Sequence, residues 1–386
     1  MNLPEAVSGA IARLEAAGYE AVAVGGCVRD SLMGREPKDY DLATDAPPEA
    51  VQAVFSGARV VPTGLRHGTV TLVAGGMAIE ITTYRVDGAY LDHRRPEDVR
   101  FTRSLAEDLR RRDFTVNAMA FSPSRGLIDP MGGQKDIEGK RIRAVGEAEA
   151  RFREDALRIL RALRFASRLG FSIEPTTARA LTSLRDSLAF VARERVGAEV
   201  CELILGPGAE AVARAHRDVL IAALPPLALV PEDAFRESLA TLSRAPAALA
   251  PRLAALFSPL PESAEDALAS LRLPARLADR ALKLIGWLTG PVPDPARALG
   301  ALGSEDARAL FAMRGADGAQ RARLEEMIAS DACVTIRQLA VNGRDLLALG
   351  LAGAAVGAAL ESLLDEVIAG APNEREALLS KIRTLL

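Results

Sequence analysis

The sequence predicts an α+β fold, in which an N-terminal domain with a mixed sheet is followed by an elongated all-α region. Two observations support this prediction. Short β-branched runs broken by Gly and Pro, which are typical of strands, are confined to the first part of the chain. After residue 150, apolar residues recur at the i, i+3 and i+4 spacing of amphipathic helices. We therefore expect a head over 1–145, a helical neck over 146–205, and an all-α body and tail over 206–386.

The individual elements follow from local patterns. Runs of about 5–7 residues read as strands, namely YEAVAVGG, KDYDLAT, ARVVP, GTVTLVAGG and MAIEITTYRV. A helix is expected over 47–55, because Asp45-Ala46-Pro47 is a typical start signal. Breaks that contain Pro or Gly divide the later part into short helices, near 206–208, 224–231, 259–261, 290–295 and 314–318.

Composition excludes several classes of protein. With 386 residues, 49% of them hydrophobic, the chain is too apolar to be disordered and long enough for two to four structural units. No apolar run reaches the length of a membrane span, and the N-terminus lacks the layout of a signal peptide. Three scattered cysteines and three histidines argue against a disulfide framework and a zinc site, and favour a cytoplasmic protein.

The charge distribution points to a local anionic ligand. The net charge of −3 gives no sign of nucleic-acid binding, yet residues 151–170 hold six Arg against one Glu and one Asp. Such a concentration suggests an anionic partner, although a solvated helix face would look the same. All four tyrosines lie in the first 90 residues, and Trp287 is the single tryptophan. Few aromatic rings are therefore available in the helical part, which predicts RNA binding by shape and backbone charge.

A glycine pair follows the first expected strand. This strand, over 21–24, ends at Gly25-Gly26, and a short helix over 28–33 comes next. Glycines at such a turn allow backbone N–H groups to approach a phosphate, and a helix N-terminus favours negative charge. Arg29 lies one turn into the helix and could add a bidentate phosphate contact. The pair could equally form a simple turn with no ligand.

The second expected strand carries two carboxylates, Asp39 and Asp41, on either side of Tyr40. Alternation along a strand places both on the same face, roughly 6–7 Å apart. Two such carboxylates repel one another unless a cation lies between them, and oxygen ligands favour Mg²⁺, which also binds substrate phosphates. The alternative is a solvated edge strand with surface charges.

Four motifs in order resemble the class II tRNA nucleotidyltransferases, the CCA-adding enzymes, and the related bacterial poly(A) polymerases. They are GGCVRD at 25–30, DYD at 39–41, RRDFTVNA at 111–118 and EDALRILRALRF at 154–165. A weaker match, VNGRDLLALGL at 341–351, resembles the start of the family's tail region. The resemblance implies a head of the polymerase β-like nucleotidyltransferase superfamily.

The resemblance also implies a mechanism. Asp39 and Asp41 would hold two Mg²⁺ ions, of which one activates the RNA 3′-hydroxyl and the other stabilises the leaving pyrophosphate. A third carboxylate could be Glu80 or Asp113, although each could instead form a structural ion pair or capping contact. The residues expected to bind the nucleotide's triphosphate and ribose are Gly25, Gly26, Arg29, Arg112 and Asn117.

Asp155 and Arg158 are the expected base-reading pair. As residues i and i+3 of one helix they would share a face. A carboxylate accepts hydrogen bonds and a guanidinium donates them, so the pair suits cytosine and adenine, which offer an amine beside a ring acceptor. Guanine and uracil present a carbonyl oxygen there instead, which leaves polar groups unpaired. Arg161 and Arg164 continue this face and could hold the triphosphate or the RNA end. A surface ion pair on an amphipathic helix is the alternative.

We therefore expect template-independent addition of CCA to the 3′ end of tRNA from CTP and ATP, with no membrane association and no protein partner implied. The alternatives are a poly(A) polymerase or A-adding specialist of the same superfamily, and a catalytically silent RNA-binding protein. The intact pair of aspartates argues against the last. The resemblance favours CCA addition, because the loop over 86–100 is full-length and PTGLRHGTVTL at 62–72 replaces an arginine-rich element.

Overall fold

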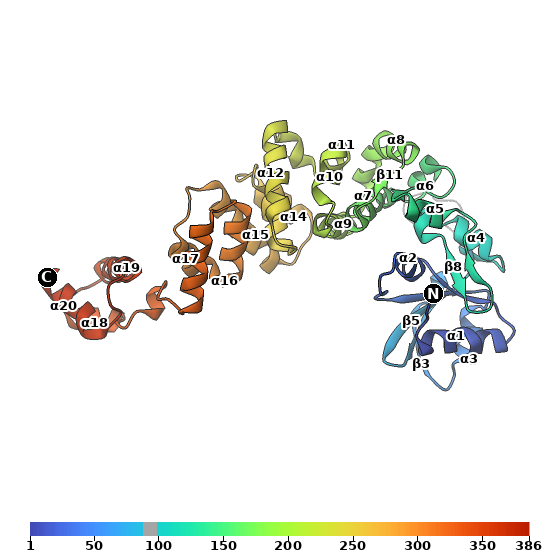
Figure 1. Cartoon of the computed structure of the whole chain (residues 1–386), viewed down its shortest axis with the longest axis horizontal. Helices are drawn as coiled ribbons and strands as arrows, with labels where there is room; N and C mark the ends of the chain where they lie inside the picture. The colour runs from blue at the N-terminus through green and yellow to red at the C-terminus, as the bar shows by residue number, and fades with distance from the viewer. Residues whose placement is uncertain (88–98, 386) are drawn as a thin grey trace. The chain divides into compact units, whose positions relative to one another are not determined.

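The computed structural model, which describes residues 1–87 and 99–385, begins with a seven-stranded mixed sheet (Figure 1). The strand order is β3-β4-β5-β2-β1-β8-β9. These strands are β1 Ala21–Val24, β2 Tyr40–Thr44, β3 Arg59–Gly64, β4 Thr69–Ala74, β5 Met77–Thr83, β8 Ala120–Ser122 and β9 Gly126–Ile128. Strand β2 pairs with β5 in parallel, whereas the other neighbours are antiparallel. The parallel pair brings side by side two segments whose paired residues are 39 positions apart in sequence.

Short helices cover both faces of this sheet. The helices of the head are α1 Glu5–Ala16, α2 Gly26–Leu32, α3 Pro48–Val54, α4 Leu105–Arg110 and α5 Gly133–Glu138. The main core lies between the sheet and helices α1 and α3, where Ile11, Leu14 and Phe55 are almost fully buried against Leu42 and Ile79. A smaller core on the other face packs Leu109 of α4 against Val22 and Tyr84. Both faces of the central strands are therefore dry, which explains their nearly continuous apolar sequences.

A group of helices follows the sheet within the same compact unit, which comprises Met1–Leu229 and Ser270–Arg272. The helices are α6 Ala148–Glu154, α7 Leu157–Leu169, α8 Pro175–Leu184, α9 Arg193–Leu205, α10 Ala209–Ala215 and α11 Arg217–Ala223. Two small ladders, β6 Arg85–Asp87 with β7 Val99–Phe101 and β10 Arg141–Ile142 with β11 Ser172–Ile173, complete the unit. Helix α7 buries its apolar face, which leaves its arginines along the other face. Helices α7 and α9 pack together.

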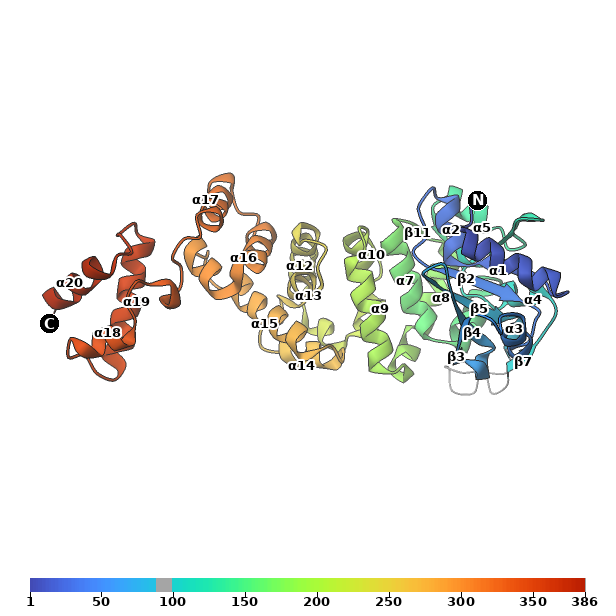
Figure 2. The same cartoon turned by 90° about the horizontal axis from the view of Figure 1, so that it is seen from below.

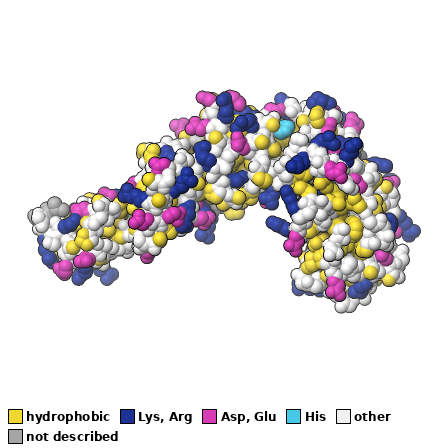
Figure 3. All heavy atoms as spheres, viewed as in Figure 1, with side chains coloured by type: hydrophobic (Ala, Val, Ile, Leu, Met, Phe, Trp, Pro, Cys, Tyr) yellow, Lys and Arg dark blue, Asp and Glu magenta, His cyan; other side chains and the backbone are white. Residues whose placement is uncertain are grey.

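The second compact unit, Val230–Ala269 with Leu273–Leu386, is helical throughout its described part (Figure 2). Its helices are α12 Glu232–Arg244, α13 Leu249–Phe257, α14 Ala264–Ser270, α15 Ala275–Thr289, α16 Pro295–Met313, α17 Gly318–Ala329, α18 Gly343–Ala348, α19 Ala354–Ile368 and α20 Arg375–Leu385. Helices α18 to α20 share a core of their own around Leu346, Leu363 and Leu378. Basic and acidic side chains are interspersed over the helices in Figure 3, with no continuous basic surface on the face shown.

The predicted fold class is confirmed, since a mixed-sheet head precedes a long series of helices. The predicted limits at 145/146 and 205/206 stay predictions; the division between compact units falls after Leu229. Most of the predicted loop over 86–100, including His93, lies outside the described residues. Among the residues that are described, no helix is both long and apolar enough to cross a membrane.

One local prediction is wrong: residues 154–165 do not form a single helix. Asp155 has extended backbone angles, φ −142° and ψ 104°, and separates α6 from α7. Its carboxylate accepts the N–H of Leu157 at 3.1 Å, which caps the start of the second helix. This capping tendency of Asp competes with helix continuation, and apolar periodicity does not reveal it.

The close approach of α7 to the end of α9 gives a stability prediction. A Cβ at Gly206 would lie 2.1 Å from the Ser167 Oγ and 2.6 Å from the Ser167 carbonyl carbon. We expect Gly206→Ala to lower the free energy of unfolding by about 1–3 kcal/mol, because overpacking forces the backbone to shift. Gly9→Ala is the matched control, since Gly9 is exposed in α1 with nothing near its Cβ position. It should stabilise by about 0.5–1 kcal/mol. Urea denaturation followed by circular dichroism tests both; equal midpoints would contradict the packing argument.

Candidate functional site

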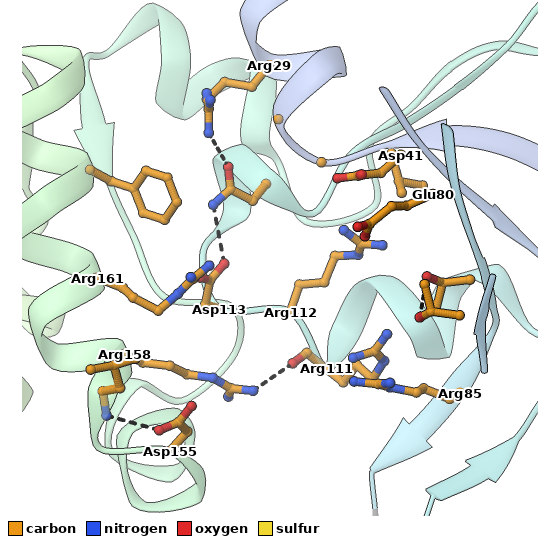
Figure 4. Close-up of a pocket in the computed structure, with 18 of the residues that line it drawn as sticks. Arg29, Asp41, Glu80, Arg85, Arg111, Arg112, Asp113, Asp155, Arg158 and Arg161 are labelled. Carbon is orange, nitrogen blue, oxygen red and sulfur yellow. Dashed lines mark hydrogen bonds and ion pairs between the residues drawn. The ribbon is translucent and has the colours of Figure 1, made fainter. Parts of the chain in front are cut away.

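A cavity of about 550 Å³ in the first unit collects most of the predicted site residues (Figure 4). Strands β1, β2 and β5, the segment after α4, and helices α7 and α9 contribute to its walls. The predicted residues that line it are Gly25, Gly26, Arg29, Asp41, Glu80, Arg112, Asp113, Asn117, Asp155, Arg158 and Arg161. Asp39 and Arg164 do not line this cavity. The motifs of the head and of the helices that follow it therefore meet around one space.

Two carboxylates lie together at the sheet side of this cavity. Asp41 and Glu80 are direct partners in the parallel register of β2 and β5, so their side chains project from the same face. Desolvation and the nearby Glu80 carboxylate raise the pKa of Asp41, while Arg112 opposes the shift. Like charges so close are stabilised by a cation. Glu80, one of two candidates for a third carboxylate, thus lies beside Asp41.

Asp39 faces a second hollow of about 480 Å³, adjoining the first. Tyr40 between the two aspartates is buried while both aspartates are exposed, as the predicted alternation requires. Asp41 lines both hollows, and so do Gly26, Arg29 and Phe165. The second hollow also holds the cations Arg35, Lys38, Arg164 and Arg168. The acidic strand therefore lies where the two spaces adjoin.

Arg112 points toward Asp41 and Glu80 in Figure 4. The Arg112 Nη2 donates to the Asp108 Oδ2 at 3.2 Å, and the same carboxylate accepts two bonds from Arg111. Burial alone would raise the pKa of Asp108, but Arg112 and Arg111 outweigh it and the pKa is lowered. The buried Arg112 Nε has no partner among the described residues. An orphan N–H beside a cavity is costly unless a ligand accepts from it.

The turn at Gly25 differs from the expectation in one respect. The φ angle of Gly25 is +77°, a region that other residues rarely adopt, and its Cβ would lie 3.2 Å from the Arg112 Nη1. Glycine is therefore required here for conformation and for the approach of Arg112. The Gly25 N–H donates to the Met119 carbonyl at 3.2 Å and so is not available to a phosphate. Helix α2 begins at Gly26, earlier than predicted.

Asp113, the other candidate for a third carboxylate, is buried and fully engaged. Its Oδ2 accepts from the Arg161 Nε at 2.8 Å, and its Oδ1 accepts from the Phe114 N–H at 2.8 Å and the Asn117 Nδ2 at 3.3 Å. Burial would raise the pKa of Asp113, but Arg161 and Arg158 lower it to about 2. The Asn117 Oδ1 accepts from the Arg29 Nη1 at 2.6 Å. A hydrogen-bonded chain thus joins α2, the 113–117 segment and α7.

Asp155 and Arg158 both line the cavity, at the break between α6 and α7. Arg195 of α9 donates to both oxygens of Asp155, at 3.3 and 2.7 Å. Arg158 is held by the Glu154 carboxylate at 2.6 Å and by the Arg111 carbonyl at 3.3 Å. Each member of the predicted base-reading pair is therefore fixed by a different neighbour, and the two do not share one helix.

Arg164 stacks on the Phe165 ring, with its guanidinium carbon 4.1 Å from the ring centroid, and pairs with Glu199 at 2.6 Å. The sequence reasoning missed the partners Arg195, Glu199 and Asp108. Asp108 was detectable, because it stands three and four residues before Arg111 and Arg112, as helical ion pairs do. Arg195 and Glu199 are 40 and 35 residues from their partners, and no local pattern identifies them.

The donor set of the sheet side fits a divalent metal ion. Asp41 and Glu80 supply carboxylate oxygens, the ligands that Mg²⁺ prefers. Within residues 1–87 and 99–385, no three His, Cys, Asp or Glu side chains come close enough to enclose an ion by themselves. An ion here would complete its coordination with water and substrate phosphates, which is usual for Mg²⁺.

Two family models match the chain. The Poly A polymerase head domain matches residues 21–143, and the probable RNA and SrmB-binding site of polymerase A matches residues 170–227. The first spans the sheet and includes Asp41, Glu80 and Asp113 of the cavity. The second begins at the end of α7 and includes α9.

Similar proteins are CCA-adding enzymes. That of Geobacillus stearothermophilus is 40% identical over 96% of this chain and 94% of its own length. That of Geobacillus thermodenitrificans is 51% identical, over 57% of this chain and about half (54%) of its own length. The crystal structure of the Bacillus stearothermophilus CCA-adding enzyme in complex with CTP has a TM-score of 0.83 and 36% identity, and covers 100% of this chain and 99% of that chain.

The ion pair of Asp113 gives a pH-dependent prediction. The folded pKa of about 2 is below the ordinary 3.8, so the pair stabilises above about pH 4, and the contribution is lost as pH falls toward 2. Asp113→Asn should lower the free energy of unfolding by about 2–3 kcal/mol at pH 7. At pH 3 the difference in free energy of unfolding between Asp113→Asn and the wild type should be about 1 kcal/mol smaller than at pH 7. Urea titrations at several pH values measure it. Asp186→Asn, whose side chain is 90% exposed, is the control; a pH-independent difference would contradict the assignment.

Proposed function

The chain belongs to the CCA-adding enzyme family and adds CCA to the 3′ end of tRNA, and we propose that CTP and then ATP bind in the cavity of Figure 4 without a nucleic-acid template. The observation that carries this proposal is the meeting of a carboxylate pair, a cationic wall and a held Asp155–Arg158 pair around one space. These are the three things that template-independent nucleotidyl transfer needs: charge stabilisation, triphosphate binding and base selection.

The triphosphate contacts the cationic wall. Arg112 offers its buried Nε, which has no partner among the described residues. Arg29 lies beside Gly26, and its Nη2 would be 3.6 Å from a Cβ atom added at Gly26. Both guanidinium groups are already oriented, by Asp108 and Asn117 respectively. Preoriented donors lose little freedom on binding, and they stabilise charge that grows on the leaving pyrophosphate.

Nucleotidyl transfer in this family depends on a divalent metal, and we propose that the metal is Mg²⁺ held by Asp41 and Asp39, with Glu80 assisting. When bound, the metal lowers the pKa of the attacking 3′-hydroxyl and neutralises the leaving group. The rigid β2–β5 pair fixes the positions of Asp41 and Glu80. Asp113 belongs to the supporting ion pair with Arg161 and does not act as the third carboxylate.

The base is selected by Asp155 and Arg158. The carboxylate accepts from the exocyclic amine of cytosine or adenine, while the guanidinium donates to the adjacent ring nitrogen. Arg195 engages both Asp155 oxygens, which fixes the orientation of the carboxylate, a group that accepts hydrogen bonds and meets the carbonyl oxygen of uracil or guanine unfavourably. A mismatched base thus leaves buried polar groups unpaired, which costs more than a missing contact.

The RNA 3′ end occupies the second hollow. Asp41 is common to both spaces, so a hydroxyl that enters from one side meets a triphosphate from the other. Arg35, Lys38 and Arg168 there supply charge for the last phosphates of the RNA. We also propose a cytoplasmic location. All three cysteines are free thiols, which is typical of proteins in a reducing compartment.

The direct test of the activity uses purified protein, Mg²⁺, labelled CTP or ATP, and tRNA transcripts that lack A, CA or CCA. Each transcript should be completed to CCA and extended no further. An oligoadenylate primer should not be extended, because the RNA must be held as a folded body. Long adenosine tracts on that primer would favour a poly(A) polymerase, and no incorporation would overturn the proposal.

Asp41→Asn should reduce transfer at least tenfold, because losing metal-assisted charge stabilisation costs several kcal/mol of barrier. The fold should be unchanged, since Asp41 is exposed in the site. Binding of Mn²⁺, measured by its paramagnetic resonance signal, should weaken in parallel. Glu49→Gln, an exposed carboxylate in the first turn of α3, is the control. More than one tenth of wild-type activity in Asp41→Asn would remove this residue from the catalytic role.

Asp155→Ala and Arg158→Ala should relax discrimination against UTP and GTP as well as slow the reaction. Each hydrogen bond to a charged group contributes about 1.5–3 kcal/mol, which corresponds to about a tenfold to hundredfold loss of selectivity. The readout is the ratio of kcat/KM for CTP over UTP. Glu149→Ala, which breaks the exposed pair with Arg153 on α6, should leave this ratio unchanged. Full selectivity in both site variants would refute base reading by this pair.

A further inference from the structure

A hollow of about 530 Å³ in the second unit lies away from every motif used above. Helices α15, α16 and α19 and the segment 334–337 contribute to its walls. Among its lining residues are Trp287, Arg297, Arg337 and Glu361. We call it the Trp287 pocket. It is of the size of small-ligand sites, and it contains the single tryptophan of the chain.

Trp287 is not one of the fully buried residues of α15. The buried residues of α15 are Ala281, Leu284 and Ile285, whereas Trp287 is only partly buried and lines the hollow. Burial of an indole is among the largest stabilising contributions that one side chain can make. A tryptophan whose surface remains open to a hollow is therefore available to pack against a ligand, and tryptophan is enriched at the centres of binding sites.

The walls around Trp287 are held rigidly. The Arg314 guanidinium donates to the carbonyls of Trp287, Gly290 and Pro291, at 3.1, 2.6 and 2.7 Å. Gly300, which also lines the pocket, approaches Val334 so closely that a Cβ there would lie 2.3 Å from the Val334 carbonyl oxygen. A capping box between Thr335 and Gln338 fixes the following turn. A ligand would thus meet a preformed surface, which lowers the entropic cost of binding.

The charges of the pocket suit a nucleotide with a single phosphate. Arg297 pairs with Glu361 at 3.1 Å and with Asp365, so its charge is compensated. Arg337 is exposed, and no ion pair of it is found among the described residues. One uncompensated guanidinium matches one phosphodiester, and it could not balance a triphosphate. Glu361 offers an acceptor for an amine or imine N–H of a base.

We propose that the Trp287 pocket binds one unpaired nucleotide of the RNA substrate, with its base stacked on Trp287, its phosphate on Arg337 and its base edge near Glu361. The proposal rests on the proposed function only in one respect, namely that the substrate is an RNA. Aromatic side chains that stack on unpaired bases beside a cation are the usual means of holding single-stranded nucleotides. Although aromatic residues are scarce in the helical part, Trp287 then provides one position for base stacking. The RNA-binding surface of this part is therefore not purely electrostatic.

Intrinsic fluorescence tests this directly, because all tryptophan emission comes from Trp287. Titration of the full chain with tRNA lacking CCA should quench the emission and saturate at the same tRNA concentration as an independent binding assay. CTP or ATP alone, at concentrations that saturate catalysis, should leave the emission unchanged. Unchanged emission on tRNA binding would overturn the proposal. Quenching by free ATP would do so as well, in favour of a free-nucleotide site.

Variants provide the second test. Trp287→Ala should weaken tRNA binding about tenfold or more, and Trp287→Phe should retain most of the affinity, since stacking survives. Leu347→Ala, which removes an exposed apolar side chain of this unit outside the pocket (55% exposed), is the control and should bind normally. The KM for CTP at saturating tRNA should be unchanged. Normal tRNA affinity in Trp287→Ala, together with normal CCA addition, would refute the pocket while the proposed function stands.

Arg337→Ala keeps the proposal testable should Trp287→Ala fold poorly, because Arg337 is exposed and its removal disturbs no core. Loss of one phosphate contact should reduce the slope of log affinity against log salt by about 1. Arg344→Ala removes an equally exposed charge outside the pocket and should reduce the slope less. Equal slopes in the two variants would show general charge attraction and contradict the phosphate contact. No CCA addition by the wild-type chain would instead overturn the proposed function.

Discussion

The ion pair between the buried Asp113 and the partly buried Arg161 connects the two parts of the site. Asp113 lies in the segment that follows α4, a helix that packs on the sheet, and Arg161 lies on α7. Because Asp113 also accepts from Asn117, which in turn holds Arg29, one carboxylate fixes Arg29 relative to the helix that carries Arg158. Breaking a buried pair leaves a charge without compensation, so the constraint is strong. The residues that we propose for base reading and for phosphate binding therefore share one rigid frame.

Many contacts of the site serve to hold a small number of side chains in fixed orientations. Asp155, Arg158 and Arg112 are each held by a neighbour that does not itself need to touch a substrate: Arg195, Glu154 and Asp108. A pair that selects bases by hydrogen-bond direction works only if neither member can rotate to accept a mismatch. Under the proposed function, selectivity depends on these supporting residues as much as on the selecting ones. The break in the helix at Asp155 is part of the same design, because it turns the carboxylate toward Arg195 and the cavity.

The sequence predicted those features of the fold and site that depend on residues close together in the chain. Alternation predicted Asp39 and Asp41 on one face, although β2 begins only at Tyr40. The β-branched runs located β1 to β5 but missed β8 and β9 of the same sheet. The parallel pairing of β2 with β5 joins residues far apart in sequence, so Glu80 could be named only as one of two candidates. Nothing local distinguished it from Asp113, whose partner Arg161 is 48 residues away. The helix break at Asp155 escaped detection because apolar residues continue on both sides, and a capping carboxylate does not change that periodicity.

The charge balance of the site limits how a substrate can enter. Most cations around the two hollows already have carboxylate partners, such as Arg164 with Glu199 and Arg161 with Asp113. A bare triphosphate would therefore gain little net attraction and would repel Asp41 and Glu80. A triphosphate that carries its own cation meets the opposite situation, because the cation satisfies the carboxylates while Arg112 contributes its unused donor. Under the proposed function, the arrangement favours the metal-bound nucleotide over the free one and couples metal binding to nucleotide binding through electrostatics.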